Sequence, residues 1–393
     1  MNLPFKTIAC HFGVVMMTVL TAPSVLAQSF VHPGALHTQA DFDRMKTKVA
    51  QGAQPWLDGW NMLIKNPHAS LSWTPRPVDV VYRGKIGNHP QNYSALFNDA
   101  AAAYALALRW KVSGDDAYAD KAVAILDAWS KTLTRIDGTS DKYLASGLYG
   151  YEFANAAEIM RTYRKWPARD FDRFKKTMLD VFYSMNHDFL MNHNGAKIDH
   201  YWANWDLCNL DSMMAIGILT DRRDIYDEAV DYFKHGKGNG AIDKMVWKIY
   251  PDGLAQTQES GRDQGHSTLD VSELGVLSQM AWNQHDDLFG YDDNRILKGV
   301  EYIAKYNLGY DVPYTTYANS DVTQDVISNM GRGATRPTWE LFYNHYVVLK
   351  GLDAPYITTW ANKVRPEGGG GNYGPNSSGF DQLGYGTLTF TLK

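Results

Sequence analysis

The sequence predicts an all-α protein, because apolar residues recur at helical spacing along most of the chain while the alternation typical of strands is nearly absent. Tyr118, Ala122, Ile125 and Trp129, for example, would lie on one face of a helix. The helices predicted in this way cover residues 40–52, 97–112, 118–130, 146–164, 169–186, 206–219, 268–283, 292–306 and 337–349.

The predicted helices form antiparallel pairs. The turn at 113–116 reads Ser-Gly-Asp-Asp, in which glycine ends one helix and aspartate caps the next. The triplet Asp116-Ala117-Tyr118 is echoed by Asp224-Ile225-Tyr226 and Asp287-Leu288-Phe289, each after an apolar helical run. Repeated helix pairs with long polar loops favour an (α/α) toroid over a bundle, which needs longer uninterrupted helices. We therefore expect an incomplete barrel of six or seven helical hairpins.

The two ends of the chain depart from this pattern. Residues 1–27 contain a cation at Lys6, an apolar run and a small-residue exit at Ala27, as in a cleaved signal peptide. Residues 28–393 are then expected to form one toroid domain of a periplasmic or secreted protein. Near the C-terminus, a glycine-rich loop is expected to close over a cleft and to lead into a short strand over 387–390.

Composition narrows the class of partner. Cys208 is the only cysteine after residue 27, so no intramolecular disulfide is expected, and no later apolar run is long enough to span a bilayer. The net charge of −5, with scattered lysines and arginines, argues against nucleic acid. The 12 tryptophans and 24 tyrosines supply rings that can stack on sugars, although most are expected in the core. We expect a monomer that binds neither nucleic acid nor a membrane.

Two polar segments, over 199–206 and 252–267, interrupt the helical scaffold, and loops of this kind often carry function. They contain the residue types needed to cleave a uronic-acid polymer by β-elimination. The carboxylate beside the weakly acidic C5 proton must be neutralised, which Asn, Gln, Arg or protonated His can do. A base then removes the proton and an acid protonates the leaving O4, usually His and Tyr. The two segments supply Asn204, Arg262, His266, His200 and Tyr201.

Each of these candidates also has a structural explanation. Asn204 could cap a helix, because asparagine is a good N-cap. Arg262 could form an ion pair, and His266 could be a buried, hydrogen-bonded imidazole. The carboxylates available to Arg262 are Asp206, Glu259 and Asp263. The concentration of Arg, His and polar amides in one short loop favours a functional site.

Two later segments add candidates. Over 305–317, either Tyr314 or Tyr317 could supply the acid, and the alternative is packing at a helix end. Over 332–346, where Pro337 is expected to begin a helix, the arginines could grip sugar carboxylates or form structural pairs.

No cofactor or metal is expected. The chain lacks a phosphate-binding glycine motif, an HExxH motif and paired CxxC motifs. The alternative is a metal bound by histidines with nearby carboxylates. The histidines in question are His193, His200 and His266.

At these motifs the chain resembles the alginate lyase superfamily of (α/α) toroid polysaccharide lyases, especially the branch that acts on mannuronan, guluronan and glucuronan and is similar to polysaccharide lyase family 38. The resemblance spans almost all of residues 28–393. It rests on Val31-His32-Pro33-Gly34, Arg83-Gly84, Asn155-Ala156-Ala157-Glu158-Ile159, Asn204-Trp205, Arg262-Asp263-Gln264-Gly265-His266-Ser267 and Tyr343-Asn344-His345-Tyr346.

The resemblance implies a secreted enzyme that cleaves 1,4-linked uronic-acid polymers, alginate or glucuronan, to 4,5-unsaturated oligouronates without a metal. Asn204 and Arg262 would hold the carboxylate, with His266 as base or neutraliser. No tyrosine closely follows that histidine here, so the acid stays open among Tyr201, Tyr314 and Tyr317. The substrate-binding residues would be Arg83, Gln91, His200, Trp205, Gln258, Glu259 and Tyr314.

Two other functions compete with the lyase. A glycoside hydrolase on the same scaffold would use two carboxylates, with candidates Asp206, Asp252, Glu259 and Asp263. A non-catalytic glycan-binding protein would bind oligouronates without turnover. The number of acid-base residues in two loops argues against the binding protein.

Overall fold

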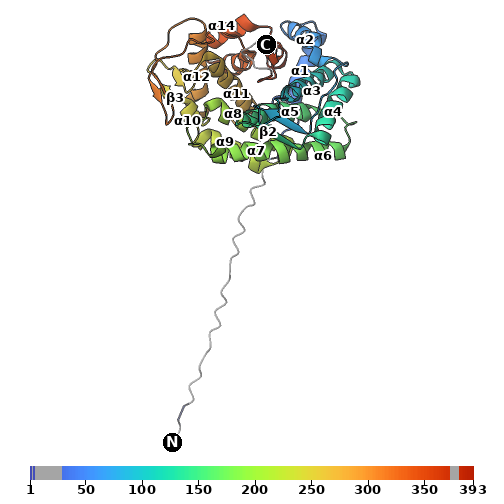
Figure 1. Ribbon diagram of the computed structural model, residues 1–393, viewed down its shortest axis with the longest axis horizontal. Helices are drawn as coiled ribbons and strands as arrows, with labels where there is room; N and C mark the ends of the chain where they lie inside the picture. Colours follow the sequence, from blue (N-terminus) through green and yellow to red (C-terminus); the bar gives the residue numbers. More distant parts are fainter. Residues whose placement is uncertain (2, 5–28, 372–379) are drawn as a thin grey trace.

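The computed structural model describes Met1 and residues 3–4, 29–371 and 380–393. In the described part the helices form an open ring of paired inner and outer layers (Figure 1), and the predicted all-α toroid is confirmed. Each inner helix contacts the next along the chain. The inner helices are α3 (Ser94–Ser113), α5 (Lys142–Met160), α8 (Ala203–Leu219) and α11 (Gln264–Asn283). The outer helices are α4 (Asp116–Thr132), α6 (Ala168–Thr177), α7 (Ser184–Asn192), α9 (Arg223–His235) and α12 (Tyr291–Asn307).

Burial distinguishes the two layers. Every residue of α8 is buried, and α5 is buried from Ala145 to its end, as expected for helices enclosed on all sides. The outer helix α9 instead buries one stripe that includes Ile225, Ala229 and Phe233 and exposes its charged face. Apolar periodicity is therefore clear in the outer helices and weak in the inner ones.

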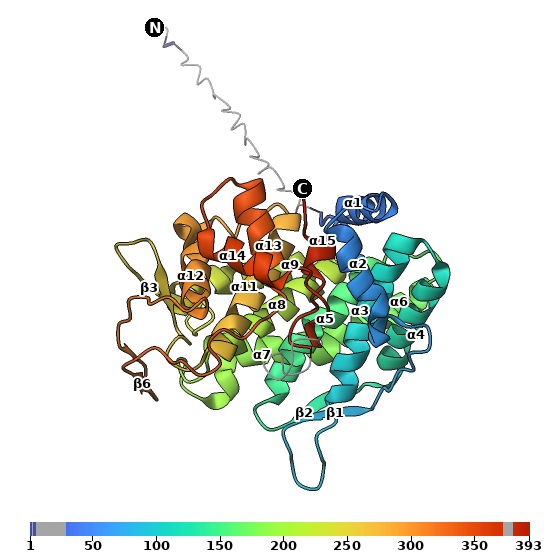
Figure 2. The same cartoon turned by 90° about the horizontal axis from the view of Figure 1, so that it is seen from above.

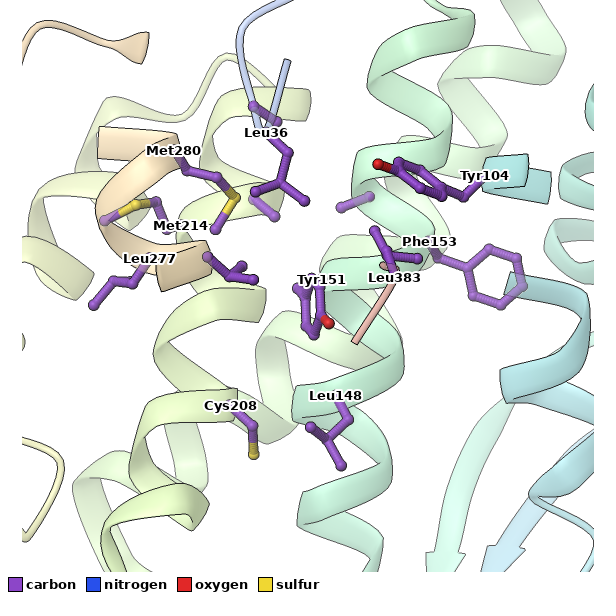
Figure 3. Close-up of a cluster of buried hydrophobic side chains, with 14 of the residues drawn as sticks. Leu36, Tyr104, Leu148, Tyr151, Phe153, Cys208, Met214, Leu277, Met280 and Leu383 are labelled. Carbon is purple, nitrogen blue, oxygen red and sulfur yellow. The ribbon is translucent and has the colours of Figure 1, made fainter. Parts of the chain in front are cut away.

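The inner helices α5 and α8 are in close contact because two glycines remove side chains from their interface. A Cβ atom on Gly147 would lie 2.4 Å from the Sγ of Cys208, and one on Gly150 would lie 2.1 Å from the Oγ of Ser212. Leu148 and Cys208 lie between the two helices in Figure 3. Substituting either glycine would therefore push the helices apart at the centre of the ring.

The remaining elements complete the ring and lie along its edges. The other α-helices are α1 (Gln39–Ala50), α2 (Trp56–Lys65), α10 (Ile242–Met245), α13 (Trp339–Phe342), α14 (Pro355–Val364) and α15 (Gly386–Thr389). Two π-helices cover Met178–Tyr183 and Tyr343–Leu349, and two short 3-10 helices cover Pro67–Ala69 and His193–Gly195. The strands form three two-stranded sheets. In the first, β1 (Val80–Arg83) pairs in parallel with β2 (Arg135–Gly138). The other two are antiparallel and pair β3 (Val246–Ile249) with β4 (Ala255–Thr257), and β5 (Tyr317–Ala318) with β6 (Thr323–Gln324).

The C-terminal segment corrects one prediction, because the strand expected over 387–390 is the short helix α15. Thr389 Oγ1 donates to the Tyr385 carbonyl four residues back, and Thr387 Oγ1 donates to the Glu340 side chain. Leu388 packs against Gly59 of α2. These tertiary contacts override the strand preference of alternating threonines and apolar residues.

Other boundaries also differ from the predictions. The helix expected to begin at Pro337 begins at Trp339, and a π-helix interrupts the one expected over 169–186. The predicted signal peptide lies outside the described residues except for Met1, Leu3 and Pro4, and residues 372–379 of the expected loop lie outside them too. No helix within the described ranges is both long and apolar enough to cross a bilayer.

Candidate active site

A cavity of about 180 Å³ lies where the inner helices α5, α8 and α11 begin. It brings together residues that are far apart in the sequence. Its lining residues are Arg83, Leu144, Leu148, Asn204, Asp263, Gly265, His266, Leu269, Arg336 and Asp381. We call Asn204, Asp263 and His266 the first wall, and Arg83, Arg336 and Asp381 the second wall. Because helix N-termini carry partial positive charge, this end of the ring favours a negatively charged ligand.

The first wall is organised around the buried carboxylate of Glu259. Its Oε1 accepts hydrogen bonds from the backbone N–H of Asn204 at 3.0 Å and from Asn204 Nδ2 at 2.6 Å. Its Oε2 accepts from Arg262 Nη1 at 2.8 Å. Because a carboxylate only accepts hydrogen bonds, these contacts fix the orientation of the Asn204 amide. Asn204 lies inside α8, whose N-cap is Trp202, so it does not cap the helix.

His266 has a defined tautomer. Its Nδ1 lies 2.6 Å from Asp263 Oδ2, and its Nε2 lies 3.1 Å from Arg262 Nη2. Arginine can only donate, so Nε2 carries the lone pair and Nδ1 carries the proton. Although burial alone would raise it, the pKa of Asp263 is lowered by the hydrogen bonds from the His266 ring and backbone N–H. The imidazole is 40% exposed, so it is hydrogen-bonded but accessible.

Arg262 shows that the structural and functional explanations apply together. It forms the expected ion pairs, with Glu259 at 2.8 Å and Asp263 at 3.8 Å, and it stacks over the Trp202 ring at 4.9 Å. It also donates a hydrogen bond to Nε2 of His266, the ring nitrogen that carries the lone pair. The guanidinium thus connects the Asn204 and His266 halves of the wall.

The second wall combines three segments of the chain. Arg83 ends β1, where the parallel pairing with β2 sets its position, and donates to the Tyr149 hydroxyl at 3.2 Å. Arg336 and Asp381 form a buried ion pair at 3.4 Å, each 3% exposed. Burial raises the pKa of Asp381, while the charges of Arg336 and Arg83 oppose that shift. Figure 2 shows the C-terminal segment reaching the middle of the ring beside α5.

Sequence reasoning missed Asp381 and described Arg336 only as one of several arginines. Asp381 follows a glycine-rich stretch, and no local pattern there indicates a site. Its position is set by contacts across the ring, including the hydrogen bond from the Tyr151 hydroxyl to the Asp381 carbonyl at 2.9 Å.

The three candidate tyrosines lie outside the residues that line the cavity. Tyr314 donates its hydroxyl proton to the Gln324 carbonyl at 3.1 Å, so that proton is committed. The hydroxyl of Tyr317 accepts from Gln258 Nε2 at 3.1 Å, and that of Tyr201 accepts from Asn194 at 3.0 Å. Both of these hydroxyls keep a proton to donate, and burial raises the pKa of Tyr317.

Most of the predicted substrate-binding residues support the scaffold around the cavity. Glu259 and Gln258 are completely buried, and Gln258 accepts from the Ala203 N–H, so neither contacts solvent. Trp205 packs on Tyr201, and His200 pairs with Asp321 at 2.7 Å. Gln91 accepts from the Gly84 N–H at 2.8 Å and so shapes the loop after Arg83. Of the predicted substrate-binding residues, Arg83 is the one that lines the cavity.

The carboxylates considered for a hydrolase are occupied or remote. Asp206 is buried and accepts from the Tyr232 hydroxyl and the Gly240 N–H. Asp252 lies in the exposed turn between β3 and β4, outside the cavity. Glu259 is buried under Asn204, and Asp263 is bound to His266. No pair of free carboxylates therefore faces this cavity within the described ranges.

The histidines considered for a metal are separated by their partners. His193 lies 3.2 Å from Asp206, while His200 and His266 are paired with Asp321 and Asp263. Among the residues that the structure describes, no three histidine, cysteine or acidic side chains are grouped as metal ligands.

Comparison with known proteins identifies relatives for this arrangement. The structure of alginate lyase A1-III from Sphingomonas species A1 superimposes with a TM-score of 0.59, at 16% identity over 93% of this chain and 98% of that chain. A variant of that enzyme complexed with a tetrasaccharide gives 0.58, at 15% identity over 93% and 98%. An alginate lyase from Bacteroides ovatus gives 0.57, at 14% identity over 92% and 100%.

These structural likenesses establish the fold. A search among curated proteins finds no significant match. The family model named Alginate lyase matches residues 56–311, which is more than half of the chain and includes both polar segments. This chain therefore belongs to the alginate lyase family.

Proposed function

We propose that this protein is a polysaccharide lyase that cleaves 1,4-linked uronic-acid polymers, alginate or glucuronan, by β-elimination. One observation carries the proposal: an oriented Asn204 amide and the unprotonated Nε2 of His266 share a cavity with two arginines. Membership of the alginate lyase family and the fold neighbours named for alginate support it. The signal peptide predicted over residues 1–27 supports action in the periplasm or outside the cell.

Neutralisation of the substrate carboxylate is the first requirement. One N–H of Asn204 Nδ2 is held by Glu259, which leaves the second N–H for the uronate carboxylate at the cleavage site. The Arg262 guanidinium lies beside it and adds positive charge. Together they stabilise the enolate that forms when the C5 proton leaves, which is where negative charge develops.

Proton transfer then completes the elimination. Nε2 of His266 exchanges its hydrogen bond from Arg262 for the C5 proton, the electron pair of the C5–H bond forms the C4=C5 double bond, and the C4–O4 bond breaks. The leaving O4 takes a proton from a tyrosine, for which Tyr317 and Tyr201 are the candidates with an uncommitted hydroxyl proton. The departing oxygen stays on C1 of the preceding sugar, so the products are one chain with a new reducing end and one chain that begins with a 4,5-unsaturated uronate.

The second wall supplies binding. Arg83 and Arg336 line the same cavity as His266, so they are placed to attract carboxylates of the polymer. The N-terminal ends of the inner helices add to this positive potential. A polymer with one carboxylate per sugar matches this repeated positive charge better than a neutral glycan does.

The decisive experiment incubates residues 28–393 with polymannuronate, polyguluronate and glucuronan without added metal and follows the ultraviolet absorbance of the unsaturated product. We expect absorbance that Asn204→Ala and His266→Ala abolish. Asn192→Ala, which removes an exposed amide bound only to Asp188, should leave it unchanged. New reducing ends without absorbance would identify a hydrolase, and binding without turnover would identify a glycan-binding protein.

The choice of acid has its own test. Tyr317→Phe and Tyr201→Phe remove the two available hydroxyl protons, and Tyr314→Phe removes one already donated to Gln324. We expect one of the first two to lose most of kcat and Tyr314→Phe to retain it. A large loss only in Tyr314→Phe would contradict this assignment.

A further inference from the structure

Asp270 is a buried acid that the proposed mechanism does not use. It lies on α11 one helical turn after His266, on the same face, and is 0% exposed. Neither of its oxygens has a hydrogen-bond donor as a partner. An ionised carboxylate left buried in this way would cost several kcal/mol, roughly the penalty for one desolvated charge. The Asp270 carboxyl is therefore stable at this position only if it carries a proton or if its burial serves a function.

The neighbour of Asp270 is Glu259, whose oxygens are already in use. They accept hydrogen bonds from the Asn204 backbone N–H, from Asn204 Nδ2 and from Arg262 Nη1. Three donors, one of them a cation, thus point at Glu259. A carboxylate offers about four lone-pair positions, so one acceptor position remains. Asp270 lies within hydrogen-bonding reach of Glu259, and when protonated it can donate to it.

The acidic groups around Asp270 oppose its ionisation. Glu259, Asp263 and Arg262 face it from the loop before α11, and Glu273 follows it on the same helix. Arg262 is the one cation in this group and is shared by Glu259 and Asp263. Burial, and then the negative charge of Glu259, raise the pKa of Asp270 well above its usual range. Burial and nearby acids, Asp211 first among them, likewise raise the pKa of Glu273.

We propose that Asp270 is a positioning residue of the lyase site, which in its protonated form donates a hydrogen bond to Glu259 and so fixes the carboxylate that orients Asn204 and Arg262. The inference rests on the proposed function for its kinetic consequence. Its structural content, a protonated carboxyl at position 270, does not. If Asp270 ionised, two adjacent negative charges would compete for Arg262 and would oppose the approach of the substrate carboxylate.

Two substitutions separate the hydrogen-bond donor from the charge. Asp270→Asn keeps a donor toward Glu259 and cannot ionise, whereas Asp270→Ala removes the donor. We expect Asp270→Asn to keep kcat within about threefold of the wild type and to lose the alkaline decline in kcat. Asp270→Ala should lose about tenfold or more in kcat, since a hydrogen bond to a charged group is worth about 1.5–3 kcal/mol. Circular dichroism and thermal unfolding check that each variant is folded.

Glu273→Gln is the matched control. Glu273 is also completely buried and unpartnered, on the next turn of α11, but none of the hydrogen bonds to Glu259 involves it. Its substitution should leave the pH profile of kcat unchanged. An alkaline limb that persists in Asp270→Asn, or an Asp270→Asn variant as impaired as Asp270→Ala, would overturn the proposal.

A spectroscopic measurement tests the protonation without any turnover. The infrared carbonyl stretch of a protonated carboxylic acid should be present in the wild type at pH 8 and reduced in Asp270→Asn. If the wild type cleaves no uronate polymer, the proposed function fails while this band still decides the state of Asp270. If the band is the same in wild type and Asp270→Asn, the inference fails even in an active lyase.

Discussion

The two walls of the cavity are built in different ways. In the first wall, Asp263 and His266 come from one short run of the chain and hold each other, so the tautomer of His266 is set locally, while Glu259 holds Asn204 of α8. In the second wall, Arg336 and Asp381 come from distant segments and meet in a buried ion pair. The proposed base is thus positioned by short-range contacts, whereas the ion pair of the second wall depends on closure of the ring.

The two walls also differ in their exposure to solvent. His266 in the first wall is 40% exposed, whereas the ion pair of the second wall is almost fully buried. Removal of a partner should therefore impair catalysis in the first wall and stability or binding in the second. The following substitutions test that division.

The largest expected effect is at Asp263, which is both the N-cap of α11 and the partner of His266 Nδ1. Asp263→Asn keeps a capping side chain but no longer enforces the tautomer that leaves Nε2 unprotonated. We expect kcat to fall about 10²-fold, the lower end of what a general base contributes, with little change in thermal stability. Asp115→Asn, at the equivalent N-cap of α4, is the control and should leave kcat unchanged. Equal activity in both variants would remove Asp263 from the mechanism.

The second wall should respond through stability. Arg336→Met leaves Asp381 buried without its ion-pair partner, which we expect to cost about 3 kcal/mol of the free energy of unfolding. Urea unfolding measures the loss. Adding Asp381→Asn to the same chain should recover part of it, because the buried charge is then removed. A double variant no more stable than Arg336→Met would show that the ion pair is not the cause.

Arg83 should affect binding more than catalysis. Arg83→Ala removes a cation from the cavity edge without touching Asn204 or His266, so we expect KM to rise about tenfold, equivalent to about 1.4 kcal/mol, with kcat nearly constant. Steady-state kinetics on the preferred polymer measure both constants. Arg135→Ala, on the adjacent strand β2 and largely exposed, is the control. A fall in kcat with constant KM would place Arg83 in the chemistry instead.

Glu273 should affect neither catalysis nor substrate binding, but only the pH dependence of stability. Because burial raises its pKa, the folded protein keeps this proton at pH values where the unfolded chain has lost it. Stability then falls as pH rises above the unfolded pKa of about 4.3, by up to about 1.4 kcal/mol per pH unit for one such group. Glu273→Gln should make the free energy of unfolding less dependent on pH between 5 and 8. Parallel curves for variant and wild type would contradict the assignment.

Several of the motifs on which the family resemblance rests contribute to the scaffold and not to the cavity. His32 bridges Glu158 and Asp221, and the N–H of Leu36 donates to Asn155, so the opening motif fastens the start of the ring to α5. In the later motif, Asn344 accepts from the Leu392 N–H. Some family motifs therefore hold the ring together and others form the site. The spacing of residues within a motif does not show which of these two roles it has.

The sequence by itself determined the helical class, the pairing of helices and the Asp263–His266 half of the first wall, because these depend on short-range periodicity and on residues within one loop. The predicted helices and the cluster of Asn204, Arg262 and His266 are all present. Tertiary structure alone decided that Glu259 is buried as a support, that residues 387–390 are helical and that Asp381 reaches the cavity. The physical reason is that burial and long-range ion pairs depend on which segments the ring brings together, and no local pattern in the chain encodes that.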